Sequence, residues 1–302
     1  MIPHRNEALP TKELLLYEGL LLVQFFLWGS GNPVGKIGLQ IFSPFYMLAM
    51  RFNLALLFFL LFSGRHLSRV FKKEDLLPCL IVSVYTAISF ATGIIALAYT
   101  TAIRVGFILS IAVVFVPFLS RIILGTVIQR RILVYILIVV VGLYFFCEVD
   151  GVLLVGFGEF LTFIAALSGA CMLVYSEKYL KNIDPMVVAT TQTAFTGISC
   201  LLIAFVVEDF PDVPAISTSG WSAILYMAVF CTCIPYTIQN KALVRVPAII
   251  VALLCTTEPI FTAIISYFML GETLSASGFI GAALIIVGVA AASLLPSTKV
   301  SA

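Results

Sequence analysis

Long apolar runs separated by short polar connections make up most of this chain. An α-helix rises 1.5 Å per residue, so about 20 apolar residues cross a hydrocarbon core of about 30 Å. The runs therefore predict an all-α integral membrane protein with ten transmembrane helices. These spans are expected at residues 14–31, 42–62, 76–97, 103–124, 132–147, 157–176, 186–207, 221–240, 248–270 and 279–295.

Composition supports this prediction and excludes several kinds of site. Of the 302 residues 62% are hydrophobic and 11% charged, which is too apolar for a soluble globule with a water-facing surface. The seven cysteines contain no Cys-x-x-Cys pattern, and both histidines lie outside the apolar runs. We therefore expect no metal site, no disulfide framework and no cofactor. No phosphate-binding loop is present, so ATP is not expected to drive the protein directly.

The distribution of basic residues predicts the orientation. If the N-terminus is cytoplasmic, most of the 17 Lys and Arg residues fall on the cytoplasmic side, and only Lys36 and Arg104 fall on the other. This bias obeys the positive-inside rule. We therefore expect a multi-pass protein of the plasma membrane, the inner membrane of the cell, with both termini in the cytoplasm.

The chain resembles an internal duplication with five spans in each half. The segment 98–146 is a weaker copy of 241–295, with Pro117 matched to Pro259 and Gly142 to Gly288. Because five is odd, the second half is inserted upside down, which predicts two inverted repeats. The predicted organisation is a cytoplasmic tail at 1–13, a first repeat at 14–147, an extracytoplasmic linker at 148–156, a second repeat at 157–295 and a cytoplasmic tail at 296–302.

Polar residues on the first and third spans mark candidate binding faces. Trp28 and Asn32 share one face of the first span, and Pro33 is predicted to break that helix. This face is typical of a gate or binding wall, although a tryptophan at the headgroup belt explains Trp28 equally well. Tyr85, Ser89 and Tyr99 share a face of the third span, which predicts either cavity lining or close helix packing.

The acid Glu258 is the strongest single signal. Burying a charge at mid-span costs about 2.5–3.5 kcal/mol on insertion scales, so Glu258, in line with Thr262, is expected to face protein or water. It either acts in transport or braces the kink at Pro259. Arg51 is interpreted as scaffold because Gln192 stands at the matching position after Pro185. Arg104 is placed at the outer mouth, where it can meet an anionic substrate group.

Several short motifs resemble the EamA-type drug/metabolite transporter superfamily. The first half carries Leu27-Trp28-Gly29-Ser30. The second half carries Gly158-Glu159, Asp184-Pro185, Glu258-Pro259 and Leu270-Gly271-Glu272, in the order and spacing of that family. The resemblance covers residues 14–295. It implies ten helices around a central cavity and the transport, usually export, of a small metabolite or amino acid without ATP.

These observations predict a secondary transporter, an exporter of a small metabolite or amino-acid-like compound, working by alternating access between the repeats. Its expected partners are a small-molecule substrate, the lipid bilayer and a coupling proton, with no nucleic acid. The other hypothesis is an intramembrane enzyme or a lipid-handling protein. The apolar runs contain no Ser/His/Asp grouping and no His-rich cluster that would support this hypothesis. The candidate residues for substrate contact or coupling are Trp28, Asn32, Tyr85, Ser89, Tyr99, Arg104, Glu258 and Thr262.

The predicted orientation is testable with single cysteines in a background free of the seven native ones. Cysteines at Asp150 and Asp212 should react with an impermeant thiol reagent on whole cells, because both positions are predicted to be extracytoplasmic. Cysteines at Lys72 and Lys181 should react only after the cells are opened. Labelling of all four positions from one side would contradict the inverted repeat.

Overall fold

The computed structural model describes residues 11–127, 130–147, 156–212 and 216–293. The predicted C-terminal tail and most of the predicted N-terminal tail and linker, including Asp150, lie outside these residues. Within them every regular element is a helix. The helices are α1 Thr11–Gly38, α2 Pro44–Val70, η1 Lys73–Asp75, α3 Leu76–Tyr99, α4 Ala102–Ser110, α5 Ala112–Leu124, α6 Arg130–Cys147, α7 Phe157–Tyr179, α8 Pro185–Val207, α9 Thr218–Ala228, η3 Val229–Cys233, α10 Ile234–Leu243, α11 Ala248–Cys255, α12 Glu258–Leu270 and α13 Ala276–Ser293.

Eight helical segments of the described chain are long and apolar enough to cross a membrane. They are Lys12–Gly38, Pro44–Val70, Lys73–Tyr99, Ala102–Leu124, Phe157–Tyr179, Pro185–Val207, Thr218–Leu243 and Ala248–Leu270. The fifth and tenth predicted runs form α6 and α13, helices of 18 residues each that fall outside these eight.

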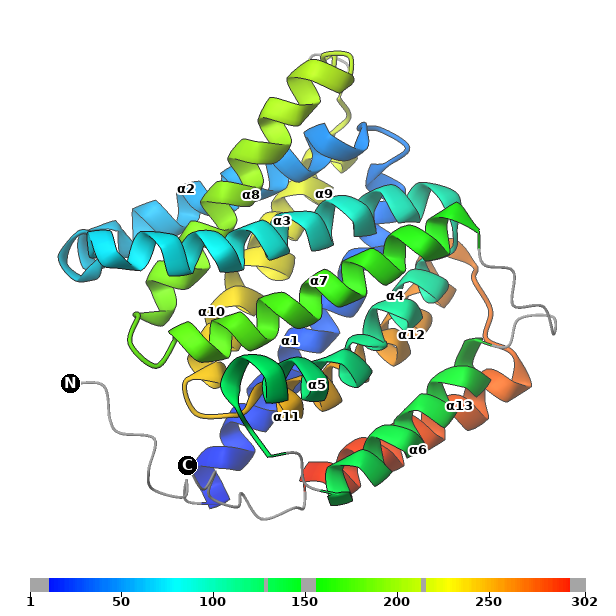
Figure 1. Ribbon diagram of the computed structural model, residues 1–302. Helices are drawn as coiled ribbons and strands as arrows, with labels where there is room; N and C mark the ends of the chain where they lie inside the picture. The colour runs from blue at the N-terminus through cyan, green and yellow to red at the C-terminus, as the bar shows by residue number, and fades with distance from the viewer. Residues whose placement is uncertain (1–10, 128–129, 148–155, 213–215, 294–302) are drawn as a thin grey trace.

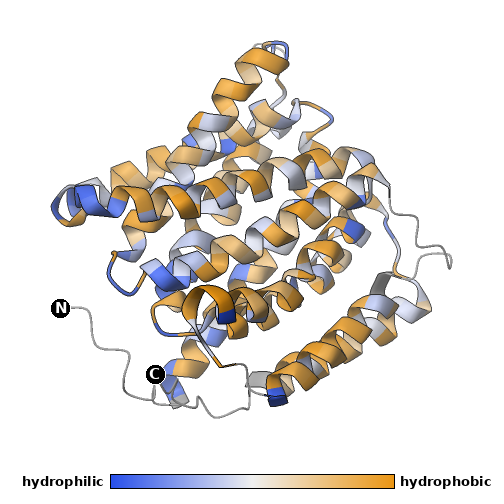
Figure 2. Ribbon diagram, viewed as in Figure 1, coloured by the Kyte–Doolittle hydropathy of each residue, from blue (hydrophilic) through white to orange (hydrophobic). Residues whose placement is uncertain are grey.

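The helices are predominantly apolar along their length, as Figure 2 shows, and many of their large apolar side chains are exposed. Phe62 and Val206 are each 84% exposed and Phe268 is 80% exposed. Water does not tolerate so many large exposed apolar side chains along such long helices, whereas lipid does. The chain is therefore a multi-pass membrane protein.

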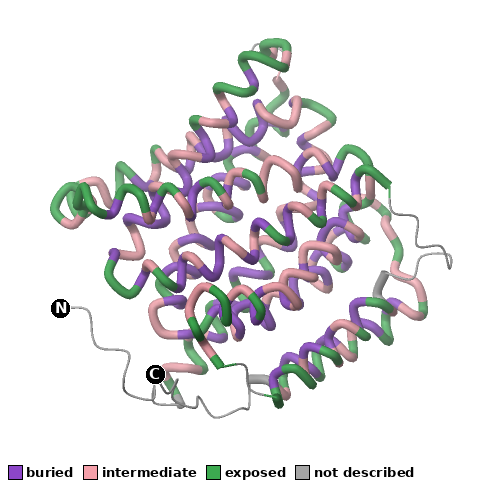
Figure 3. The backbone as a smooth tube through the Cα atoms, in the orientation of Figure 1, coloured by how far each residue is buried: buried purple, intermediate pink, exposed green. Residues whose placement is uncertain are grey.

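Helices from the two halves of the chain pack against each other throughout the fold (Figure 1). Helix α2 lies along α8, α3 along α7, and α1 along α10 and α12. Helix α4 also contacts α12. Helices α6 and α13 pair with each other at one side of the bundle, with buried residues along their shared face (Figure 3). The interior between the halves is thus built from both.

Three of the predicted spans are interrupted helices, and one of them, the eighth, is formed by α9, η3 and α10. The ninth is divided at Thr256 and Thr257, between α11 and α12 and close to Pro259, which agrees with the predicted kink. The fourth is divided at Ile111, between α4 and α5, whereas Pro117 lies inside α5. These two interrupted spans match from end to end, because the same number of residues separates their first residues, Ala102 and Ala248, as separates their last, Leu124 and Leu270. The prediction that matched Pro117 to Pro259 was therefore wrong. In the matched helices Pro259 corresponds to Val113.

Pro33 does not break α1, contrary to the sequence prediction. The helix continues through it to Gly38. Proline lacks the N–H that would bond the carbonyl four residues earlier, which here belongs to Gly29. The Thr262 hydroxyl donates to that carbonyl at 3.0 Å, so the freed acceptor is satisfied by α12 and the helix persists.

The packing of α6 on α13 gives a stability prediction. A methyl group added to Gly142 would lie 2.9 Å from the Gly281 carbonyl oxygen, whereas one added to Gly64 meets nothing within 4 Å. Gly142→Ala should therefore lower the melting temperature of the purified protein, because α6 and α13 have to separate. Gly64→Ala should leave it unchanged or raise it slightly, since alanine stabilises a helix interior by about 0.5–1 kcal/mol over glycine. Equal melting temperatures for the two variants would contradict the close packing.

Candidate functional site

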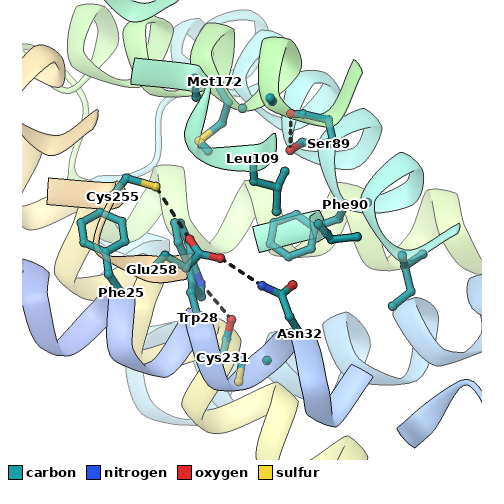
Figure 4. Close-up of a pocket in the computed structure, with 18 of the residues that line it drawn as sticks. Phe25, Trp28, Asn32, Ser89, Phe90, Leu109, Met172, Cys231, Cys255 and Glu258 are labelled. Carbon is teal, nitrogen blue, oxygen red and sulfur yellow. Dashed lines mark hydrogen bonds between the residues drawn. The ribbon is translucent and has the colours of Figure 1, made fainter. Parts of the chain in front are cut away.

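A cavity of about 150 Å³ lies inside the bundle between the two halves. Most of its wall is apolar, and the wall includes Phe25, Phe90, Leu109, Met172 and Leu173. Figure 4 shows Trp28, Asn32, Cys231, Cys255 and Glu258 gathered around one part of this opening, with Phe90, Leu109 and Met172 facing them. A space of this size accommodates one small organic molecule.

Glu258 reaches the cavity because α1 and α12 lie very close together. A methyl group on Gly29 would come within 2.9 Å of the Glu258 carbonyl oxygen, so only glycine fits at this crossing. The approach sets Asn32 Nδ2 at 3.4 Å from Glu258 Oε1 and at 3.3 Å from Thr262 Oγ1. Glu258 is 6% exposed and also accepts a 3.7 Å contact from the Cys255 thiol. Both contacts to the carboxylate are long, so a closer donor can replace them.

A second polar group near the cavity is the backbone carbonyl of Cys231, in the five-residue π-helix η3. Pro235 has no N–H, so this carbonyl lacks the donor that an α-helix supplies four residues on. Two side chains donate to it instead: Trp28 Nε1 at 3.2 Å and Arg51 Nη2 at 2.7 Å. The π-helix thus joins α1 and α2 at the cavity wall, and π-bulges recur at functional sites.

Arg51 is a cavity residue that is 5% exposed. Its Nε donates to Thr232 Oγ1 at 2.8 Å, and its guanidinium carbon lies 5.0 Å and 5.2 Å from the ring centroids of Phe90 and Phe52. Among the described residues no carboxylate lies within 4.0 Å of it, and none of their cations lies within 4.0 Å of Glu258. Two opposite, unpaired charges therefore line one cavity.

A wider vestibule of about 530 Å³ lies at the end of the bundle where α3 passes into α4. Its wall includes Lys36, Tyr99, Arg104 and Glu159, and Leu97 lines both the vestibule and the cavity. Arg104 Nη1 lies 3.5 Å from Glu159 Oε1. The vestibule thus has charged walls and is separated from the cavity by an apolar side chain.

Glu272, in the second half of the chain, bonds to Lys36 and to the start of α4 beside the vestibule. Its carboxylate accepts the backbone N–H groups of Ala102 and Ile103 at 3.3 Å each, at the start of α4. Lys36 Nζ lies 3.3 Å from it and also donates to the Thr100 carbonyl at 3.1 Å. A carboxylate at a helix N-terminus is favoured by the unsatisfied N–H groups and the helix dipole.

Beyond the other end of the cavity, buried amides fill the interior. Gln24 donates to Gln239 at 2.9 Å, and Gln239 also lines the cavity. Asn240 donates to Gln192 at 3.0 Å, and Gln192 donates to Thr86 at 3.0 Å. These bonds link α1, α3, α8 and α10.

A model of the EamA-like transporter family matches residues 15–147 and again residues 156–294. The chain belongs to this family.

Relatives of known sequence agree with that assignment. An uncharacterized transporter of Archaeoglobus fulgidus is 29% identical over 97% of this chain and 90% of its own length. The uncharacterized transporters YetK and YyaM of Bacillus subtilis are 25% and 24% identical, over 86% and 93% of this chain and 82% and 94% of their own lengths. One solved crystal structure superposes with a TM-score of 0.76 over 94% of this chain and 98% of that chain, at 15% identity, which shows a shared fold.

The structure separates the predicted site residues of this EamA-like chain into three groups. Trp28, Asn32, Ser89 and Glu258 line the cavity. Tyr99 and Arg104 line the vestibule. Tyr85 and Thr262 line neither: Tyr85 stacks on Tyr175 with ring centroids 5.6 Å apart, and the fully buried Thr262 joins α12 to α1.

Sequence reasoning overlooked other cavity residues. Arg51 was interpreted as scaffold, yet it lies on the cavity wall. The aromatic and sulfur-containing residues Phe25, Phe90, Met172, Cys231 and Cys255 also line it. Arg51 was detectable, because an arginine deep in a span is itself a signal of function. The apolar residues were not, because nothing in their local sequence distinguishes a cavity wall from packed core.

Proposed function

We propose that this protein is a secondary transporter that exports a small metabolite or amino-acid-like compound across the plasma membrane. The observation that carries this is the cavity between the two halves, lined by buried charges and too small for a macromolecule. A ligand site at the interface of two repeats, near the middle of the membrane, is the usual arrangement in secondary carriers. The family and its relatives favour transport over the enzymatic or lipid-handling hypothesis.

The proposed architecture is ten transmembrane helices in two inverted repeats, with α6 and α13 as the fifth and tenth. The pattern of helix packing supports it. If each helix is replaced by the helix at the same position in the other half, the contact of α3 with α7 becomes the contact of α10 with α1. The pairs α2 with α8 and α6 with α13 remain the same pairs under this exchange. Such a pattern follows when two similar units pack about a two-fold axis. The repeats then correspond to residues 14–147 and 157–295, between the proposed tails and linker.

The proposed orientation places both termini in the cytoplasm and the vestibule on the outer side. Lys36 and Arg104, the basic residues predicted to lie outside, both line that vestibule. The buried amides around Gln24 and Gln239 then close the cytoplasmic side. Alternating access follows if this amide region opens while the vestibule closes.

Glu258 is proposed to carry the coupling proton. It is buried at a helix break, and within the described parts of the chain its carboxylate accepts only two long contacts, from Asn32 and Cys255. The other charged group of the cavity wall is Arg51. A carboxyl group in that position can exchange a proton with the cavity when one side opens to water.

Glu258→Gln tests this role. The variant should fold and insert, because the amide oxygen still accepts from Asn32, but it should lose the pH dependence of transport in proteoliposomes. Efflux measured from pH 5.5 to 8.5 checks this, with the untouched protein as reference. An unchanged pH profile would rule out coupling through Glu258, and loss of folded protein would show that the carboxylate braces the helix break.

A second prediction compares two arginines. Arg104 lines the vestibule, whereas Arg245 lies between α10 and α11 and is absent from the walls of both the vestibule and the cavity. Arg104→Gln should therefore slow uptake or efflux several-fold more than Arg245→Gln at equal expression, because the vestibule loses a charge that attracts anionic groups. The matched substitution controls for the loss of one positive charge. Equal and negligible losses would make both residues membrane anchors.

A further inference from the structure

The cavity wall carries two ionisable side chains of opposite charge that have no counter-ion among the described residues. Arg51 and Glu258 are its only charged lining residues in the part of the chain that the structure describes. A buried ion without a counter-ion is costly, and polar groups at membrane depth are normally paired. Here each ion is held by weaker contacts and faces the same space.

Arg51 is arranged to receive an anionic group. Nε and Nη2 are occupied by Thr232 and the Cys231 carbonyl, while Nη1 has no hydrogen-bond partner among the described residues. The guanidinium also lies over the aromatic rings of Phe90 and Phe52, which help to hold it in place. A positioned guanidinium with a free N–H edge is the preferred partner of a carboxylate.

Glu258 is arranged to receive a cation. Its oxygens accept from the Asn32 amide at 3.4 Å and from the Cys255 thiol at 3.7 Å, both neutral and distant donors. An ammonium group entering the cavity can approach the carboxylate more closely and form charge-assisted hydrogen bonds. An anion alone would leave Glu258 unpaired, and an amine alone would leave Arg51 unpaired.

Most of the remaining wall is apolar. Phe25, Phe90, Leu109, Met172 and Leu173 contribute to it, and Trp28 bonds the same Cys231 carbonyl as Arg51. Such a wall accommodates a compact apolar body.

We infer that the cavity binds a small zwitterion with an apolar side group, its carboxylate on Arg51 and its ammonium on Glu258. This inference rests on the proposed transport function and names the substrate class and the anion subsite. Arg51 is then a substrate-binding residue. The zwitterion supplies both counter-charges at once, so the occupied cavity holds two ion pairs where the empty one holds two separate charges.

Trp28 provides a direct readout. The chain has two tryptophans, and Trp221, 43% exposed on α9, lies outside the cavity wall. In a Trp221→Phe background, fluorescence reports Trp28 alone. The ligands are alanine, leucine and methionine, with the amide and the N-acetyl derivative of each, added to purified protein in detergent.

At least one zwitterion should change Trp28 fluorescence saturably, at a concentration at least about tenfold lower than either of its derivatives, because each derivative leaves one buried charge unpaired. Arg51→Gln should weaken binding of the zwitterion and the N-acetyl compound but not of the amide. Glu258→Gln should weaken binding of the zwitterion and the amide but not of the N-acetyl compound. Arg121→Gln, an exposed position on α5 outside the cavity wall, is the matched control and should change none of them.

Arg51→Lys keeps the test valid if Arg51→Gln does not fold. It retains the charge but loses the planar fork, so it should weaken binding of the zwitterion and the N-acetyl compound several-fold and spare the amide. The inference is overturned if a derivative binds as tightly as its zwitterion, if the Arg51 and Glu258 variants weaken all ligands equally, or if folded protein responds to no zwitterion.

Proteoliposomes separate this inference from the transport proposal. Movement of the derivatives as fast as of the zwitterion leaves the transporter intact and overturns the charge-pair site. Saturable, charge-dependent binding of a zwitterion without any movement across the membrane overturns the transporter and leaves the site standing.

Discussion

A hydrocarbon environment offers no water to a carbonyl that loses its helical partner, and this constraint organises the centre of the protein. Pro33 and Pro235 each remove one N–H from a helix. The carbonyls that lose these donors, on Gly29 and Cys231, are satisfied by side chains from other helices: Thr262 in one case, Trp28 and Arg51 in the other. The two prolines thus free the carbonyls to which Thr262, Trp28 and Arg51 donate hydrogen bonds.

The same constraint explains why charge lies where it does. At the ends of the bundle, carboxylates accept hydrogen bonds from the backbone N–H groups of helix starts. Glu272 does so for α4, and Glu208 does so for α2, where it accepts from Phe45 and Tyr46. In the interior, Arg51 donates hydrogen bonds to neutral groups, Glu258 accepts them from neutral groups, and both line the cavity. The acids at the ends thus stabilise helices, while the interior pair faces the cavity. The acids that stabilise helix starts and the charged residues that line the cavity are therefore at different depths along the helices.

Much of this architecture was predictable from hydrophobic pattern, because a run of about 20 apolar residues has few other stable environments. Glu258, Trp28 and Asn32 were also identifiable, since polar residues in apolar helices are few and conspicuous. The continuity of α1 through Pro33 was not, because it depends on Thr262, which is remote in sequence. Nor was the break at Ile111, which has no proline beside it. The bonding partners of Arg51 were not predictable either, because they lie on the π-helix η3, a feature that leaves no periodic signal in the sequence.

The crossing of α6 and α13 bears on how the chain can evolve. A methyl group on Gly288 would lie 2.7 Å from Val139, just as one on Gly142 would meet Gly281 and Leu284, so each half supplies the small residue on which the other half packs. A larger residue in one helix has to be matched by a smaller one opposite. Substitutions in one half of this crossing are therefore constrained by the residues of the other half. We expect positions along the crossing of α6 and α13 to covary, including in relatives whose cavity residues differ.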